Sequence, residues 1–264
     1  MPIIRLTLVL AFVAGASAAA ADWPHWRGPN GTGATSETNL PVRWSATENV
    51  AWKALIGGLG VSTPIVSGDQ VVVTSQIGAS ERRPGNHPRL VQGGNAADAG
   101  ERALGGTRRP QADDGRVHFL VESFRRADGR RLWEHRLPAE GPMPGVHDKH
   151  NLASPSPITD GQMVYAWFGT GQIVALDMSG KLVWQRHLGK EISPFEVAWG
   201  HSSSPTLFGD LLILLCDHEP SAYLLAVDKR TGQQRWKADR GKGRMSYSTP
   251  LVVNTPSGPE LVVN

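Results

Sequence analysis

The sequence predicts an all-β fold, a β-propeller of four-stranded antiparallel blades, with about four blades present as a partial ring. Three observations predict it: the glycine and proline content, a recurring Gly-x-x-x-Trp motif, and a recurring Ser-Pro or Thr-Pro step. The chain has 30 Gly and 19 Pro among 264 residues, which excludes a helical bundle because both residues destabilise helix interiors. A hydrophobic content of 40%, with nine Trp, suffices for a packed core.

The first repeated motif places a glycine four residues before a tryptophan. It occurs at Gly129 and Trp133, Gly180 and Trp184, and Gly232 and Trp236, so the spacings are 51 and 52 residues. Self-similarity at a period of this length is typical of propellers and solenoids. Because a residue that recurs once per repeat serves the packing of the repeat, we expect all three tryptophans in the core and the glycines in tight turns.

The second repeated motif precedes an apolar run in each repeat. Its steps lie 93, 48 and 45 residues apart, at Thr63-Pro64, Ser156-Pro157, Ser204-Pro205 and Thr249-Pro250. In each complete repeat, two apolar runs separated by a turn follow this step. A third short run then carries the tryptophan. In the second repeat the middle run is 172–177. Three or four short strands within 45 to 52 residues describe a propeller blade.

Residues 78–116 account for the long first interval as an insertion. They contain eight Gly, three Pro and seven Arg, and they lack Phe, Trp and Tyr. Such a composition cannot bury enough apolar area to order a loop of this length. We therefore expect a flexible, solvated insertion.

The repeats resemble those of pyrroloquinoline-quinone (PQQ)-type propeller proteins. The matching residues are an Ala-Leu-Asp or Ala-Val-Asp strand ending at Asp177 or Asp228, the glycine of the turn, and the tryptophan that follows it. The opening segment 22–33 is similar to the leader of a secreted subgroup of these proteins. The turn at 124–129 departs from the pattern, with Arg in place of the acidic residue. The resemblance implies a leader over 22–48 and PQQ-like repeats over 49–264.

The number of repeats predicts an open ring. The chain holds three Gly-x-x-x-Trp motifs, and a fourth unit ends at 260–264 before its own. Since the resemblance implies rings of seven or eight blades, we expect a C-terminally truncated chain whose open strand edges pair with another chain. The alternative is a small four-bladed ring in which residues 49–52 donate the closing strand.

The first 21 residues predict export. Arg5 is followed by an apolar run over 6–14 and a small-residue cleavage site at 16–18, which is the pattern of a secretory signal peptide. The apolar run is shorter than a membrane span, so we expect a periplasmic or extracellular protein with no membrane span after cleavage. A net charge of +3 is too small to indicate nucleic-acid binding.

The candidate ligand-binding residues occupy equivalent places on successive repeats, which converge in a propeller. They are His150, Asn151, His201, Ser202 and Tyr247. His147 and His150 are weaker candidates for a metal site, because two imidazoles on a loop have no fixed geometry; a polar loop between blades is the alternative. The single cysteine, Cys216, excludes an internal disulfide and is expected to be a small buried residue.

Two classes of function follow. The first is a non-catalytic exported propeller that acts as a binding or scaffold module for a protein or carbohydrate partner. The second, implied by the resemblance, is a fragment of a PQQ- and calcium-dependent dehydrogenase that oxidises alcohols or sugars. No residue is assigned a catalytic role, and no cluster of acids and Asn that would hold calcium is evident. The sequence therefore favours the binding module.

Overall fold

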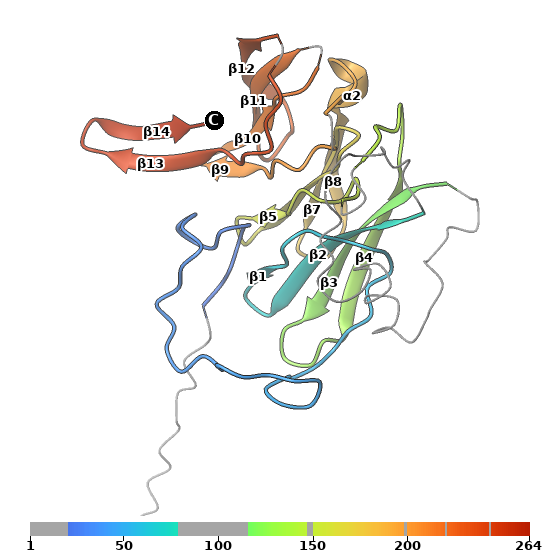
Figure 1. Ribbon diagram of the computed structural model, residues 1–264, viewed down its shortest axis with the longest axis vertical. Helices are drawn as coiled ribbons and strands as arrows, with labels where there is room; N and C mark the ends of the chain where they lie inside the picture. Colours follow the sequence, from blue (N-terminus) through green and yellow to red (C-terminus); the bar gives the residue numbers. More distant parts are fainter. Residues whose placement is uncertain (1–20, 79–115, 147–149, 198–199, 220, 243) are drawn as a thin grey trace, which may run out of the picture.

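The computed structural model describes residues 21–78, 116–146, 150–197, 200–219, 221–242 and 244–264 (Figure 1). Within these residues the secondary structure is almost entirely antiparallel β-sheet, with the single helical turn α2 at Leu188–Glu191. The predicted signal peptide (1–21) lies outside the described residues except for residue 21. The predicted insertion (78–116) lies outside them except for residues 78 and 116. No helix among the described residues is long and apolar enough to cross a membrane.

Three four-stranded sheets follow one another in chain order and form three blades. The first blade contains β1 (Ile65–Ser67), β2 (Gln70–Ile77), β3 (His118–Arg125) and β4 (Arg131–Pro138). The second contains β5 (Ile158–Thr159), β6 (Met163–Trp167), β7 (Gln172–Asp177) and β8 (Leu182–His187). The third contains β9 (Thr206–Phe208), β10 (Leu211–Cys216), β11 (Ala222–Asp228) and β12 (Gln234–Gly241). The predicted all-β fold with four-stranded antiparallel blades is confirmed.

The fourth unit is a two-stranded hairpin of β13 (Leu251–Thr255) and β14 (Gly258–Val262). Among the described strands, β14 pairs with β13 alone, and residues 49–52 form no strand. The four-bladed ring closed by residues 49–52, the alternative weighed from the sequence, is therefore not formed. Figure 1 shows the hairpin standing apart from the first blade.

The hydrophobic core lies between neighbouring blades. One cluster joins β6 and β7 of the second blade to β10 and β11 of the third, and another joins the first blade to the second. The third strand of each blade is buried nearly throughout, whereas the outer strands β4 and β12 alternate between exposed and less exposed residues. This pattern follows because a third strand is covered on both faces and an outer strand is not.

Two tryptophans of the repeat, Trp184 and Trp133, pack on the turn of the next blade. The Trp184 indole donates from Nε1 to the Lys229 carbonyl at 2.9 Å, and Gly232, at φ 72°, lies under its ring. A Cβ at Gly232 would come within 2.7 Å of the indole, so only glycine permits this approach. Trp133 contacts Gly180 and donates to the Met178 carbonyl in the same way.

Trp52 makes the equivalent contact on the first blade. Its Nε1 donates to the Arg126 carbonyl at 2.8 Å, and a Cβ at Gly129 would lie 2.4 Å from its ring. Trp52 thus occupies the position that an outer-strand tryptophan of a preceding blade takes, although residues 49–52 are not a strand.

All three repeat tryptophans pack against core clusters, but only one of them is buried. Trp184 is only 9% exposed, but Trp133 and Trp236 are half-buried. The outer strand of a blade lies at the periphery, where an indole is only partly covered. Trp184 gains additional cover from Tyr165 of its own sheet, whose ring centroid lies 6.2 Å away.

The leader is anchored to the inner strands. Trp23 exchanges two backbone hydrogen bonds of 2.9 Å with Val66 of β1, and the Pro24 carbonyl accepts from the Thr159 amide of β5 at 3.0 Å. The leader therefore links the first and second blades along their inner edge, and it brings Trp26 there.

Candidate functional site

A series of hydrogen bonds connects the inner edges of all four units. The Thr63 amide donates to the Ser156 hydroxyl at 2.9 Å, the Ser156 amide to the Ser204 hydroxyl at 2.9 Å, and the Ser204 amide to the Thr249 hydroxyl at 3.0 Å. Each of these residues directly precedes a proline. The repeated Ser-Pro or Thr-Pro step thus supplies one link per blade, and we call this series the hydroxyl ladder.

The hydroxyl ladder forms one wall of a cavity of about 250 Å³, which we call the inner cavity. Its lining combines hydroxyl groups from all four units with three aromatic or imidazole rings and one valine: Trp26, Val61, Thr63, His150, Ser154, Ser156, Ser202, Ser204, Tyr247 and Thr249. Among these lining residues there is no carboxylate, ammonium or guanidinium group. The inner cavity is therefore polar but uncharged apart from the one imidazole.

The structure brings three of the five predicted ligand-binding residues together. His150, Ser202 and Tyr247 all line the inner cavity, although they come from different repeats. Asn151 and His201 do not line it. Equivalent positions on three successive repeats thus lie around one cavity; that they bind a ligand stays a prediction.

Asn151 has a local structural role. Its Nδ2 donates to the Leu59 carbonyl at 2.8 Å and its Oδ1 accepts from the Ala153 amide at 3.0 Å. These bonds join the segment before the second blade to the chain beside β2, and they leave the side chain turned towards backbone rather than towards a ligand.

His201 is buried behind the inner cavity. It is 1% exposed, and its ring lies 4.2 Å from Trp167 and 5.2 Å from Phe195 between ring centroids. Burial, followed by the nearby His218 and His150, lowers the pKa of His201 to about 3. The ring is therefore neutral at physiological pH.

The metal site predicted at His147 and His150 finds no support in the described residues. His147 lies outside them, and among the described residues no group of three or more His, Cys, Asp or Glu side chains is placed to hold a metal ion. The Asp217 carboxylate accepts hydrogen bonds of 2.8 and 3.1 Å from the Arg240 guanidinium. Cys216 is buried, and burial raises the pKa of its thiol, which makes it unreactive.

The inner cavity does not fit a quinone bound with calcium. Calcium takes six to eight oxygen ligands that include carboxylates, and the described lining residues supply hydroxyl groups and rings. The carboxylates of the quinone call for cationic partners, and the lining offers no Arg or Lys. No step of a reaction is therefore assigned to these residues.

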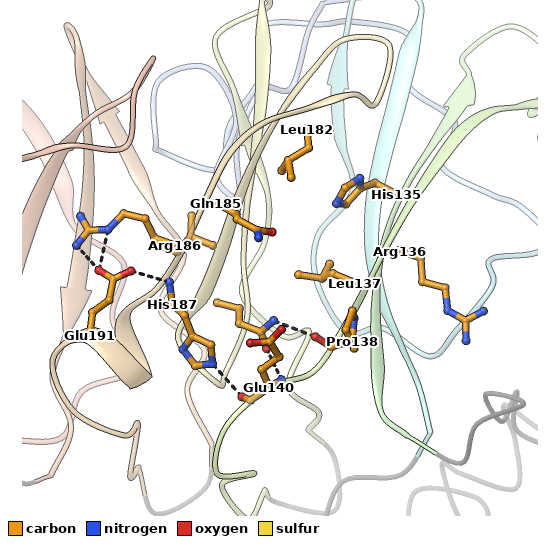
Figure 2. Close-up of a pocket in the computed structure, with 12 residues that line it drawn as sticks. His135, Arg136, Leu137, Pro138, Glu140, Leu182, Gln185, Arg186, His187 and Glu191 are labelled. Atoms are coloured by element: carbon orange, nitrogen blue, oxygen red, sulfur yellow. Dashed lines mark hydrogen bonds and ion pairs between the residues drawn. The ribbon is translucent and has the colours of Figure 1, made fainter.

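A second cavity, the outer groove, lies between the outer strands β4 and β8 (Figure 2). It measures about 430 Å³. Its lining mixes apolar side chains with charged ones: His135, Arg136, Leu137, Pro138, Glu140, Gln172, Ile173, Leu182, Gln185, Arg186, His187 and Glu191.

One end of the outer groove is fixed by hydrogen bonds between the two blades. Gln172 accepts from the Glu140 amide at 2.7 Å and donates to the Pro138 carbonyl at 3.0 Å. Lys190 pairs with the Glu140 carboxylate at 2.6 Å and lowers its pKa. Figure 2 shows His187 and Arg186 on the β8 side, where both bond Glu191. The groove is therefore preformed at this end.

Sequence reasoning missed the remaining residues of both cavities to different degrees. The hydroxyl ladder had a signal, since all four of its residues belong to the Ser-Pro or Thr-Pro step, which we treated only as a marker of the repeat. Trp26 had a weaker signal: the pair Trp23 and Trp26 in the leader can form a stacking site for a sugar or ring cofactor, but the sequence favoured a role in anchoring the leader. The outer groove had none, because it depends on how β4 and β8 face each other.

Replacing Ser204 with alanine is expected to lower the free energy of unfolding by about 1 to 3 kcal/mol. The change leaves the buried Ser156 amide without its acceptor, which costs the desolvation of that group. Ser202→Ala is the matched control, because the Ser202 side chain makes no hydrogen bond to the described residues. Chemical denaturation measures both; equal stability of the two variants would contradict the ladder.

Comparisons with known proteins identify the family. A family model described as outer membrane protein assembly factor BamB matches residues 30–192 and 120–262. No curated protein matches the sequence. Similar solved structures are quinohemoprotein alcohol dehydrogenase ADHIIG from Pseudomonas putida HK5 (13% identity, 72% of this chain and 22% of that chain, TM-score 0.41) and BamB from Moraxella catarrhalis (16% identity, 82% and 64%, TM-score 0.35).

The chain covers 22% of the length of the dehydrogenase and 64% of the length of the BamB structure. The family match extends over most of the chain and over all four units. The chain therefore belongs to the family of PQQ-type propeller proteins described as outer membrane protein assembly factor BamB.

Proposed function

We propose that this chain is an exported, non-catalytic propeller that acts as a scaffold module and holds a protein partner in the outer groove. The description of its family as an assembly factor supports a protein partner. The signal-peptide pattern over residues 1–21 supports export. The observation that carries the proposal is the outer groove, a preformed cavity flanked by two strand edges.

The strand edges make the groove suited to an extended segment. β4 and β8 are the last strands of their sheets, and no described strand pairs with the outer edge of either. Free backbone amides and carbonyls at a sheet edge accept an added strand from another chain. The backbone then supplies affinity, and the side chains of the groove select the partner's sequence.

The side chains of the groove favour a segment with apolar residues beside an acidic one. Leu182, which is 37% exposed, offers an apolar contact, whereas Leu137 and Ile173 form a buried floor beneath it. Arg136 makes no ion pair with the described residues, whereas Arg186 is already paired with Glu191. Figure 2 shows the Arg136 side chain extending away from the other residues of the groove, so its unpaired charge would meet an acidic side chain of a strand added along the edge of β4.

Photo-crosslinking in the native host tests this proposal. A benzoylphenylalanine at position 182 replaces a leucine that lines the groove and is 37% exposed, and one at position 183 replaces its neighbour on the opposite face of β8, which is 50% exposed. We expect a discrete protein adduct from position 182 and none from position 183. Arg136→Glu is expected to reduce the adduct.

Two outcomes would count against the outer groove as the binding site. One is an equal yield of adducts from positions 182 and 183, which would indicate random collisions. The other is an adduct from position 182 that Arg136→Glu leaves unchanged, because a strand added along the edge of β4 would place one of its side chains beside Arg136. Circular dichroism of each purified variant checks that the blades are folded.

A further inference from the structure

The inner cavity is chemically unlike the outer groove and is separated from it by the width of the blades. The inner cavity lies at the first strands of the sheets, and the outer groove lies at the last. A protein segment in the outer groove leaves the inner cavity unused, so this cavity calls for a separate explanation that goes beyond the proposed function.

Hydroxyl groups in the inner cavity are oriented to donate. The oxygens of Ser156, Ser204 and Thr249 each accept a backbone amide of the neighbouring unit. Their hydroxyl hydrogens have no acceptor among the described residues, and a hydroxyl that accepts still carries one hydrogen to donate. The ladder therefore presents donors from three successive units to whatever fills the cavity.

Aromatic rings stand beside these donors. Trp26 is 42% exposed and Tyr247 is 37% exposed, and both line the inner cavity. The Arg27 guanidinium lies 5.5 Å from the centre of the Trp26 ring, which helps to hold the indole in place. Exposed rings next to convergent polar groups are the combination that fixes a small ligand in a protein cavity.

Charge and size narrow the class of ligand. A charged ligand would lose its hydration without gaining an ionic partner, since the described lining has no acidic or basic side chain other than His150. The volume of about 250 Å³ is just below the roughly 300 to 1,000 Å³ typical of drug-sized ligands. The cavity therefore suits a single uncharged ring with several oxygen acceptors.

We propose that the inner cavity binds one neutral pyranose sugar unit. The apolar C–H face of the sugar packs on Trp26 or Tyr247, and its ring and hydroxyl oxygens accept from the serine and threonine hydroxyls of the ladder. Ser202, whose side chain makes no hydrogen bond to the described residues, contributes a further hydroxyl. The site selects the sugar because the sugar is uncharged and has one apolar face and several polar oxygens.

Saturation-transfer NMR on the full mature chain tests this site with four probes: glucose, galactose, mannose and N-acetylglucosamine. We expect saturable binding of at least one probe. Trp26→Ala is expected to weaken that binding about tenfold, which corresponds to roughly 1.4 kcal/mol, and Ser202→Ala about threefold. Trp44→Ala, which removes a 71% exposed tryptophan of the leader outside the cavity, is expected to leave the affinity unchanged.

Charged analogues complete the experiment. Glucuronate and glucosamine are expected to bind more weakly than glucose, because the cavity cannot pair either charge. The proposal is overturned if none of the four neutral sugars saturates, if the charged analogues bind as tightly as the neutral ones, or if Trp44→Ala weakens binding as much as Trp26→Ala. Arg136→Glu, the variant of the outer groove, should not affect sugar binding, so the two proposals fail independently.

Discussion

Trp184→Ala is expected to lower the free energy of unfolding by about 3 to 5 kcal/mol, the range typical of deleting a large core side chain. The substitution removes an indole that is 9% exposed and packed in the cluster between the second and third blades. It also removes the donor to the Lys229 carbonyl and leaves a void over Gly232. Urea denaturation measures the loss.

Two further variants separate the contributions within this contact. Trp184→Phe keeps an aromatic ring but loses the indole donor, and it is expected to cost less than the alanine variant. Trp44→Ala removes an indole that is 71% exposed and is expected to change stability within about 0.5 kcal/mol. A Trp184→Ala protein as stable as the Trp44→Ala protein would show that the tryptophan-on-turn contact does not hold the blades together.

The blades were predictable because each depends on short stretches of sequence. The glycine turn and the outer-strand tryptophan recur every 51 or 52 residues, and the structure places Gly129, Gly180 and Gly232 at positive φ between strands, as expected. The exact burial of each tryptophan was not predictable, because it depends on side chains outside the motif. Trp184 has the Tyr165 ring beside it, whereas Trp133 and Trp236 stay half-buried.

A departure from the repeat was compensated by a neighbour. In the second and third blades, the carboxylates of Asp177 and Asp228 accept amides of their turns. In the first blade the pattern has Arg125, and Asp128 instead accepts the Arg130 amide at 3.1 Å and pairs with Arg125. A carboxylate within the turn thus has the same effect from another position, which a fixed motif does not anticipate.

The candidate sites were less predictable than the blades. His150, Ser202 and Tyr247 were identified because equivalent positions converge, but neighbouring positions in the same loops point elsewhere, as Asn151 and His201 do. The outer groove combines side chains about 50 residues apart on β4 and β8, and neither strand alone carries a pattern that distinguishes it from any other outer strand.

Stability is expected to fall as pH is lowered from about 6.5, and His201 is expected to account for one proton of that dependence. Burial lowers its pKa to about 3 in the folded chain, below the ordinary value near 6.5. The unfolded chain therefore takes up a proton in this range before the folded chain does. The stabilisation is complete above pH 6.5 and is lost progressively as pH falls towards 3.

The slope for one proton is about 1.4 kcal/mol per pH unit, so the loss between pH 6.5 and 5 is about 2 kcal/mol. His201→Phe, which keeps an aromatic ring beside Trp167 and Phe195, is expected to reduce the pH slope by that one proton. His135→Phe serves as the control, because burial also lowers the pKa of His135 but its ring is only half-buried, and a smaller change in slope is expected. Denaturation at stepped pH values measures the stability of all three proteins.

Identical slopes for the wild-type chain and His201→Phe would mean that His201 takes up its proton at the same pH in the folded and the unfolded chain. The conclusion that His201 is neutral in the folded chain would then be wrong.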